Sequence, residues 1–300
     1  MLAARLTDAL PQVRTGARTA TVNGVELEAD TRPHLTARLT EWLYAHLHAG
    51  LADRNVALAL AKRDRWLEQA LSAAVPHRAA PVRAVLRSAG ESLLVEWDGV
   101  LVRVPAAAAV RIPAVGEPVD LLVPPARPAL SPGFLFVSGS RTVDLSEAAL
   151  RVYVHVSDED SAVAVWRAVL QTLESNAIAY QAKVLSRARQ YPRRDAIVVY
   201  LPSADDAPVV ADAVRDLPGV LDETSVLAER LARGVATAWE PSDARPGRAR
   251  QSFGQHRCAV LAQALLDAAD RDERSEPAIV RAFLDAGIDP ANPARNVGRP

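Results

Sequence analysis

The stretch from residue 151 to residue 201 constrains the fold most, because the spacing of its apolar residues changes from that of a strand to that of a helix and back. It begins with Arg-Val-Tyr-Val-His-Val, a strict alternation that predicts a β-strand. Arg151, Tyr153 and His155 therefore share one face of this strand, and three valines lie on the other. The strand presents polar groups on one side and an apolar surface on the other.

A helix and two more strands follow this first strand. Apolar residues at helical spacing predict a helix from about Ser161 to Ser175. The runs 180–185 and 197–201 predict two strands, joined by the basic connection 187–194. If the three strands pair, Lys183 and Tyr200 lie on the same sheet face as Tyr153 and His155, together with several arginines.

Composition excludes several classes of protein. The chain has 300 residues, almost half of them apolar, which is enough for one large domain or two smaller ones. Its single cysteine rules out a disulfide framework, and its net charge of −1 argues against a general nucleic-acid surface. No apolar run is long enough to span a membrane, and the N-terminus lacks an export pattern. We therefore expect a cytoplasmic protein with no membrane contact.

The rest of the chain predicts an α+β fold. Apolar spacing predicts helices up to about Leu71, one of them capped by Thr31 or Thr36 and another over 56–71. The segment 82–123 is β-rich, with a hairpin signal at Asp98-Gly99, and a proline-rich connector follows. We expect N-terminal helices and a small β-module over 1–125, then a domain over 126–290 with a mainly antiparallel sheet and helices on one face, and a frayed tail over 291–300.

Three helices are predicted after residue 201, over 209–215, 226–234 and 258–269. The last follows a basic, mobile loop at 242–250 and the segment Ser252–Arg257. A helix N-terminus with a serine, free amides and an arginine suits a phosphate, so Ser252 and Arg257 are candidate phosphate ligands. Cys258 falls within the apolar pattern, which favours a core residue over a nucleophile.

No cofactor or metal is indicated by the motifs. The sequence has no Walker loop, no dinucleotide-binding glycine pattern and no zinc-ligand spacing. His46 and His48 are two residues apart on a predicted helix and point to different faces, which makes them a poor metal pair. We expect chemistry that needs neither a metal nor a redox cofactor.

Five motifs together resemble the HopA-type type III effector family: Ser131-Pro-Gly-Phe134, Arg151-Val-Tyr-Val-His155, Lys183-Val-Leu, Tyr191-Pro-Arg-Arg-Asp195 and Ser252-Phe-Gly-Gln-His-Arg257. The resemblance implies an actinobacterial lyase of class V lanthipeptide or thioamitide biosynthesis. Such a lyase removes phosphate from phosphoserine or phosphothreonine in a ribosomal precursor peptide, giving dehydroalanine or dehydrobutyrine. It implies a separate phosphotransferase-like kinase as partner.

A more distant likeness to the phosphothreonine lyases of enteric pathogens implies residue roles. Lys183 resembles their base, His155 their acid, and Tyr200 the end of their tyrosine-ended strand. Tyr153 stands where those enzymes have a second lysine, a departure for which Arg151 is positioned to compensate. The candidate phosphate ligands are Arg151, Arg193, Arg194, Arg257, Tyr200, Tyr153 and Ser252.

The residue types fit this chemistry. A lysine base must be neutral to remove an α-proton, a histidine can donate a proton to the leaving group, and arginine binds phosphate oxygens through its planar fork. A binding role is the alternative: a non-catalytic subunit would use the same arginines to hold the phosphorylated precursor or its kinase. A free, perturbed lysine beside the histidine favours the enzyme, and a lysine buried in an ion pair away from any cleft favours the binding protein.

Overall fold

The computed structural model describes residues 1–15, 18–51, 64–97, 99–145, 149–243, 245–248 and 251–298. Its centre is an antiparallel seven-stranded sheet of order β13-β14-β10-β12-β11-β9-β8. The strands are β8 (Ala126–Ser131), β9 (Phe134–Ser138), β10 (Leu150–Val156), β11 (Gln181–Leu185), β12 (Arg193–Leu201), β13 (Glu229–Ala232) and β14 (Val235–Trp239). The three strands expected from the sequence pair as β10-β12-β11, with Lys183 opposite Val198 and Val198 opposite Tyr153. The predicted α+β architecture is confirmed.

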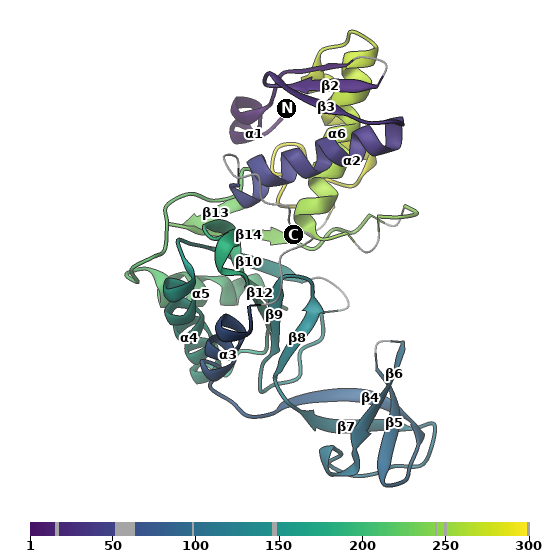
Figure 1. The fold of residues 1–300 in the computed structure, drawn as a ribbon, viewed down its shortest axis with the longest axis vertical. Coiled ribbons are helices and arrows are strands. Elements are labelled where there is room, and N and C mark those ends of the chain that lie inside the picture. Colours follow the sequence, from purple (N-terminus) through teal and green to yellow (C-terminus); the bar gives the residue numbers. More distant parts are fainter. Residues whose placement is uncertain are drawn as a thin grey trace.

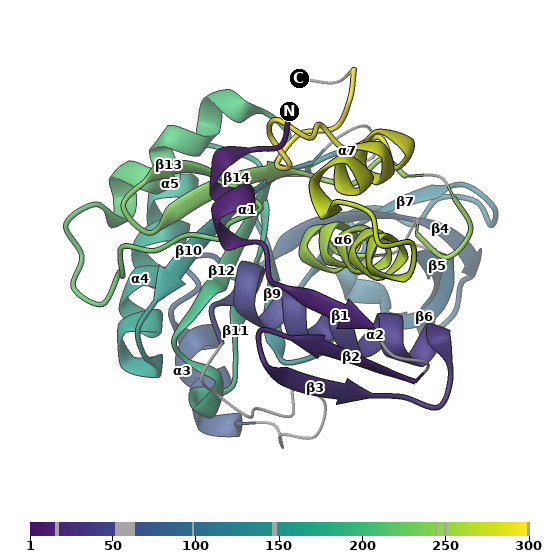
Figure 2. The same ribbon diagram turned by 90° about the horizontal axis from the view of Figure 1, so that it is seen from above.

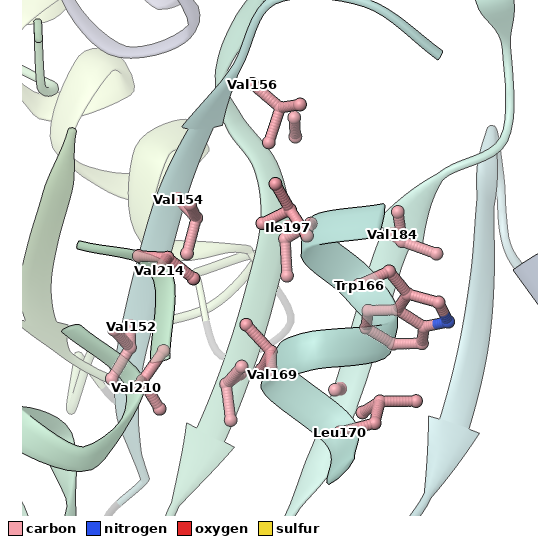
Figure 3. Packing of buried hydrophobic residues seen from close by; sticks show 14 of the residues in the cluster. Val152, Val154, Val156, Trp166, Val169, Leu170, Val184, Ile197, Val210 and Val214 are labelled. Atoms are coloured by element: carbon pink, nitrogen blue, oxygen red, sulfur yellow. The ribbon is translucent and has the colours of Figure 1, made fainter. Parts of the chain in front are cut away.

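The valine face of β10 packs against three helices, α3 (Arg65–Ala73), α4 (Glu159–Ser175) and α5 (Ala207–Val214). Figure 3 shows this core, in which Trp166 of α4 lies among valines and leucines of the sheet and helices. Trp166 is fully buried and donates its indole N–H to the carbonyl of Leu71. Asp158 caps α4, since its carboxylate accepts from the Ser161 amide.

The opposite face is also covered, which corrects the expectation of helices on one face only. Here α2 (Arg32–Leu43), the π-helical turn η1 (Tyr44–Ala49), α6 (Phe253–Asp270) and α7 (Ser275–Asp285) form a second core. Tyr153 and Val198 of the sheet belong to this core. Figure 2 shows α4 and α5 on one side of the sheet and α6 and α7 on the other. Thr31 caps α2, and Cys258 is buried in α6, as predicted.

The N-terminal region contains a small sheet that the helical prediction missed. After α1 (Ala4–Ala9), the strands β1 (Val13–Thr15), β2 (Thr19–Val22) and β3 (Val25–Glu28) pair antiparallel. Asn23 and Gly24 form the two-residue turn between β2 and β3, with φ values of 49° and 84°. Asn-Gly favours this turn because both residues tolerate positive φ. Of the helix predicted over 56–71, residues 56–63 lie outside the described ranges and α3 covers the end.

The β-rich segment forms a separate sheet, as predicted. This sheet has four strands in the order β6-β5-β4-β7. Its strands are β4 (Ala80–Ser88), β5 (Ser92–Trp97), β6 (Val100–Pro105) and β7 (Pro118–Val123), and a short turn η2 (Ala106–Ala108) follows β6. The sheet has a small core of its own. Figure 1 shows it projecting from one end of the molecule, opposite α2 and α6. Asp98 of the hairpin signal lies outside the described residues.

Four further expectations are corrected. The segment 226–234 is not a helix: β13 and β14 form a hairpin there, and Gly234, at φ 63°, lies in its turn. Arg193 and Arg194 lie in β12 and not in the connection before it, which contains the turn η3 (Ala188–Gln190). The proline-rich connector includes the edge strand β8. Residues 291–297 are packed and not frayed, since Ala294 is buried and its carbonyl accepts from the Trp239 amide.

The prediction for 209–215 is confirmed by α5, which follows the turn η4 (Ala204–Asp206). None of the helices within the described ranges is long and apolar enough to cross a bilayer.

Candidate functional site

Lys183 lies at the centre of the sheet face that the sequence analysis singled out. It faces the same side as its cross-strand neighbours Phe136 on β9 and Val198 on β12. Its Nζ lies 4.7 Å from the ring centroid of Phe134 and 5.9 Å from that of Tyr200. The side chain is half-buried. Within the described part of the chain, no carboxylate forms an ion pair with Lys183.

Arg151 lies on the same face, one strand beyond Tyr200. Its guanidinium carbon is 5.0 Å from the Tyr200 ring centroid, and Nη2 donates to Glu240 at 2.6 Å. Burial alone lowers the pKa of Arg151, but nearby Tyr153, Tyr200 and Glu240 raise it by more, so the group stays charged. The Glu240 side chain is 37% exposed, whereas that of Arg151 is 8% exposed.

A buried ion cluster lies beneath this face. Arg193 holds Asp195 through two hydrogen bonds of 2.7 and 2.8 Å, and the Tyr44 hydroxyl donates to the same carboxylate at 2.8 Å. Burial raises the pKa of Asp195, but the charge and hydrogen bonds of Arg193 lower it by more, so the carboxylate remains ionised. Arg193 is thereby committed to Asp195. Its guanidinium carbon lies 5.6 Å from the ring centroid of Phe134, the ring that Lys183 also contacts.

His48 joins this cluster, although sequence reasoning found no role for it. Its Nδ1 lies 2.9 Å from the Ser225 hydroxyl and its Nε2 lies 3.8 Å from Asp195. Burial, together with the charges of nearby Arg193, Arg151 and Lys183, lowers the pKa of His48 to about 4 and outweighs the raising effect of Asp195. A Cβ atom on Gly254 would lie 2.4 Å from the His48 ring, so α6 needs glycine there. The signal in the sequence was the segment Tyr44-Ala-His-Leu-His48, which places two histidines close to a tyrosine on one helix.

Acid should destabilise the fold through two buried histidines, because burial also lowers the pKa of His256 to about 4. The unfolded state takes up protons below the ordinary histidine pKa of about 6.5, whereas the folded state does so only near 4. The unfolding free energy should therefore fall between pH 6.5 and 4, by up to about 1.4 kcal/mol per pH unit for each histidine. Urea unfolding over this range measures the slope.

The variant His48→Gln should lose one histidine's share of that slope. The exposed His34 offers a matched control, and His34→Gln should keep the full slope. An unchanged slope in His48→Gln would contradict the buried neutral state of His48.

His155 lies near the end of β10, next to Val154. This strand is two strands away from β11, which carries Lys183. Two strand spacings amount to about 10 Å. Its Nδ1 is 3.0 Å from the carbonyl of Glu223 and donates to it, which leaves Nε2 as the acceptor. Burial lowers the pKa of His155, and the charge of Arg194 adds to this. The sheet thus carries both residues on one side without bringing them into contact.

Arg194, Arg257 and Ser252 are placed away from Lys183 by their contacts. Arg194 donates to the His46 carbonyl and to Glu223 at 2.5 Å, on the His155 side. Ser252 is the N-cap of α6 and forms a capping box with Gln255. These residues secure α6 and the 223 loop, and they do not line the Lys183 face.

Arg257, a predicted phosphate ligand, is fully buried. Its guanidinium donates to the carbonyls of Pro293 and Arg295, to the side chain of Asn296 and to His256. These contacts hold residues 293–296 against α6. Burial lowers the pKa of Arg257 to about 10.

Tyr153 has a buried hydroxyl that, among the described residues, finds no hydrogen-bond partner. The residue is 3% exposed, and its ring packs against those of His48 and Phe253 at 5.2 and 6.1 Å. Burial raises the pKa of Tyr153, so the hydroxyl stays protonated. The group is available as a donor next to Arg151.

Tyr153→Phe should stabilise the protein, because an unsatisfied buried hydroxyl costs about 1–3 kcal/mol. Chemical denaturation should give an unfolding free energy above that of the wild type. Tyr191 is equally buried but donates its hydroxyl to the Leu185 carbonyl at 2.6 Å, so Tyr191→Phe should destabilise. Losses in both variants would show that the Tyr153 hydroxyl has a partner.

A metal site is not supported by the arrangement. Among the residues that the structure describes, no three His, Cys, Asp or Glu side chains gather where they could hold an ion. The side chains that do gather are cations and aromatic rings, and these suit an anion.

Comparison with known proteins gives a family. Residues 125–295 match the HopA1 effector protein family. Two similar solved structures are the effector proteins from Pseudomonas syringae pv. tomato strain DC3000, 19% identical, and from Pseudomonas syringae pv. syringae strain 61, 16% identical. Each match has a TM-score of 0.43 and covers 54% of this chain and 62% of the effector, which is less than two thirds of its length. No curated protein matches the chain.

Proposed function

Because the chain belongs to the HopA1 effector protein family, we propose that it is a family member that eliminates phosphate from phosphoserine or phosphothreonine. The substrate is a peptide phosphorylated by a separate kinase, and the product carries dehydroalanine or dehydrobutyrine. The biosynthesis of a class V lanthipeptide or a thioamitide is the setting that we propose. The observation that carries this proposal is the half-buried Lys183, which forms no ion pair with a carboxylate of the described residues, on a face shared with Arg151.

In this proposal, Lys183 is the base. Its neutral amine removes the α-proton of the phosphorylated residue, the electron pair of the Cα–H bond forms the Cα–Cβ double bond, and the Cβ–O bond breaks. Phosphate leaves with the electron pair of that bond. The rings of Phe134 and Tyr200 hold the lysine stem and limit the positions of Nζ. Elimination requires no oxidant, and a lysine suffices as its base.

Arg151 is the proposed phosphate ligand. Its guanidinium stays charged, and its fork matches two phosphate oxygens once Glu240 moves aside. The unpartnered Tyr153 hydroxyl supplies a further donor on the same strand. Together these groups offset the charge that develops on the leaving phosphate. Arg193, Arg194, Arg257 and Ser252 are left out of the proposed ligand set because of their structural contacts.

Two candidates exist for the proton donor. The resemblance implies His155, but its pKa is lowered by burial, so the imidazole is mainly neutral at pH 7, and it lies two strands from Lys183. The ring of Tyr200 is 5.9 Å from Nζ of Lys183 and is half-buried. We therefore propose that Tyr200, in preference to His155, donates the hydrogen bond to the leaving oxygen.

A non-catalytic subunit that binds the precursor peptide or its kinase is the second candidate. The commitment of Arg193 and Arg257 to structural contacts favours it, since fewer free arginines remain for catalysis. In contrast, Lys183 has no ion-pair partner among the described residues, and this favours the enzyme.

Mass spectrometry of a synthetic phosphoserine peptide incubated with the protein tests the proposal. Elimination gives a peptide that is lighter by the mass of one phosphoric acid. The dehydroalanine in this product then reacts with an added thiol. Simple hydrolysis restores serine, and its product does not react with thiols. Binding of the phosphopeptide without any change in its mass would support the non-catalytic subunit.

A further inference from the structure

The small four-stranded sheet ends in a strand whose outer edge is open. β6 stands first in the order β6-β5-β4-β7 and pairs with β5 on its inner side. Among the described residues, no backbone hydrogen bond from outside β5 reaches residues 100–104. Arg103 is the one charged residue of β6, and it donates back to the Ser92 hydroxyl of β5 at 3.0 Å. The outer edge of β6 therefore presents N–H and C=O groups between mainly apolar side chains.

Three other sheet edges are protected. Along β7, Ala109 bridges to Leu121, and the Val110 amide donates to the Asp120 carbonyl at 3.0 Å. Pro128 and a register shift interrupt β8, one edge of the large sheet. β13, the opposite edge, has only four residues, two of them charged. Natural sheets use such features to prevent pairing with other chains, so an edge that lacks them is suited to pairing.

Apolar side chains lie on both faces beside the open edge. Val100 is 60% exposed and Leu101 is 59% exposed. Neighbouring residues of a strand point to opposite faces. Val100 therefore lies on the side of the small core, where Val102 and Val104 pack, and Leu101 lies on the other side. An added strand would cover both exposed side chains, whereas a ligand on one face of the sheet would cover only one.

The start of β6 is the end that lies near the large sheet. Val100 lies opposite Trp97 of β5. The Trp97 ring centroid is 4.6 Å from the guanidinium carbon of Arg127 on β8, so this contact joins the two sheets. Arg127 lies opposite Phe136, and Phe136 lies opposite Lys183. The open edge is therefore continuous with the proposed site at its Val100 end.

We propose that the edge of β6 binds the substrate peptide as an added antiparallel strand, through the segment that precedes the phosphorylated residue. This proposal rests on the lyase function proposed above. Every strand pair among the described residues is antiparallel. An antiparallel strand on β6 has its C-terminal end beside Val100. The residues that follow this segment would then enter the Lys183 face.

The distance to the base sets the position of this segment in the peptide. The Trp97–Arg127 contact and two strand spacings separate the start of β6 from Lys183 by about 15 Å, which an extended chain covers in about five residues. The paired segment therefore ends about five residues before the phosphorylated residue. Main-chain pairing supplies affinity for an extended segment, and the exposed Val100 and Leu101 favour β-branched or apolar residues in it.

A second copy of this chain is the rival occupant, because two open edges can also pair with each other. β6 has only six residues, and one strand pair of that length is small beside the ~1,200 Å² that a stable interface buries. A peptide has a second point of attachment at the Lys183 face, and two weak contacts in one ligand reinforce each other. These two points favour the peptide.

Calorimetry with non-reactive peptides tests the edge. The phosphoserine is replaced by a phosphonate in which CH2 stands for the bridging oxygen, so no elimination occurs. One peptide carries Val-Thr-Val-Thr-Val about five residues before the phosphonate, a second carries it about five residues after, and a third carries Gly and Ser in its place. The wild type should bind the first peptide about tenfold more tightly than the other two, as expected for several cross-strand pairs.

N-methyl groups on the first peptide separate strand addition from side-chain contact. In an antiparallel pair, only alternate amides of the added strand face the edge. N-methylation of the Val amides or of the Thr amides should therefore weaken binding to the level of the Gly and Ser peptide in one case only. Equal affinities of the two methylated peptides would contradict strand addition.

Leu101→Lys places on β6 the kind of charge that protects natural edges and should remove the preference for the first peptide. Leu122→Lys is the matched control, since Leu122 is 51% exposed and lies on the protected edge strand β7. It should retain the full preference. Both side chains are exposed, so both variants should fold. A preference that survives in Leu101→Lys would overturn the proposal.

Equal affinity of the wild type for the first and third peptides would also overturn it, as would tighter binding of the second. Sedimentation of the peptide-free protein should give a monomer. A dimer that Leu101→Lys dissociates would assign the edge to a second copy and remove the peptide site. None of these measurements depends on turnover, and the lyase proposal fails separately, if reactive phosphopeptides keep their mass.

Discussion

Lys183→Ala will lower kcat for elimination by about 10³-fold, within the range for removal of a general base. The affinity for the phosphopeptide should change little, because the base acts on the α-proton while Arg151 and Tyr153 hold the phosphate. The side chain is half-buried and has no ion-pair partner among the described residues, so the fold should persist. Phosphate release measured at saturating peptide gives kcat.

Gln181→Ala is the matched control for Lys183→Ala. Gln181 lies two residues away on the same strand, faces the same side and is equally half-buried. It should retain near wild-type kcat. If Lys183→Ala releases phosphate at a rate close to that of Gln181→Ala, Lys183 is not the base. The non-catalytic subunit would then become the favoured function.

Asp195→Ala should destabilise the fold by about 3–5 kcal/mol, the cost typical of removing one partner of a buried ion pair. The substitution leaves the guanidinium of Arg193 buried without its carboxylate, and the Tyr44 hydroxyl without its acceptor. It also removes the carboxylate nearest to His48. The midpoint of urea unfolding should fall accordingly.

Asp212→Ala provides the control for this prediction. Asp212 pairs with Arg215 on the surface, where its side chain is 62% exposed, and such pairs contribute about 0–1 kcal/mol. A midpoint for Asp195→Ala as high as that of Asp212→Ala would mean that the cluster adds nothing to stability. Because the cluster underlies the Lys183 face, an unstable Asp195→Ala should also lose activity at temperatures where Lys183→Ala remains folded.

The local pattern of the chain determined much of the central sheet. Strict alternation predicted β10 and the common face of Arg151 and Tyr153, because side chains of a strand alternate regardless of what packs against it. Helical spacing predicted α4 and α5. Of the two predicted caps, Thr31 and Thr36, Thr31 caps α2; such a cap can be found in the sequence because it is formed by residues a few positions apart.

Tertiary contacts decided which polar groups are available. Arg193 and Arg257 looked like any other arginines in the sequence, yet both are buried, and Arg257 is held by Asn296, 39 positions further along the chain. The hydrogen bond between Tyr44 and Asp195 spans 151 positions, and no local spacing predicts such a pair. The same holds for the Arg127–Trp97 contact, which joins strands of two different sheets.

The misassigned elements have the same cause. Glu229–Ala232 is a short, mostly exposed segment whose strand conformation comes from pairing with β14, and that pairing outweighs a weak helical pattern. Sequence by itself determined the period of each strong element and the residues on each of its faces. Only the tertiary structure decided which faces are covered, because burial depends on neighbours distant in sequence, and burial separates the half-buried Lys183 from the buried cations that serve the fold.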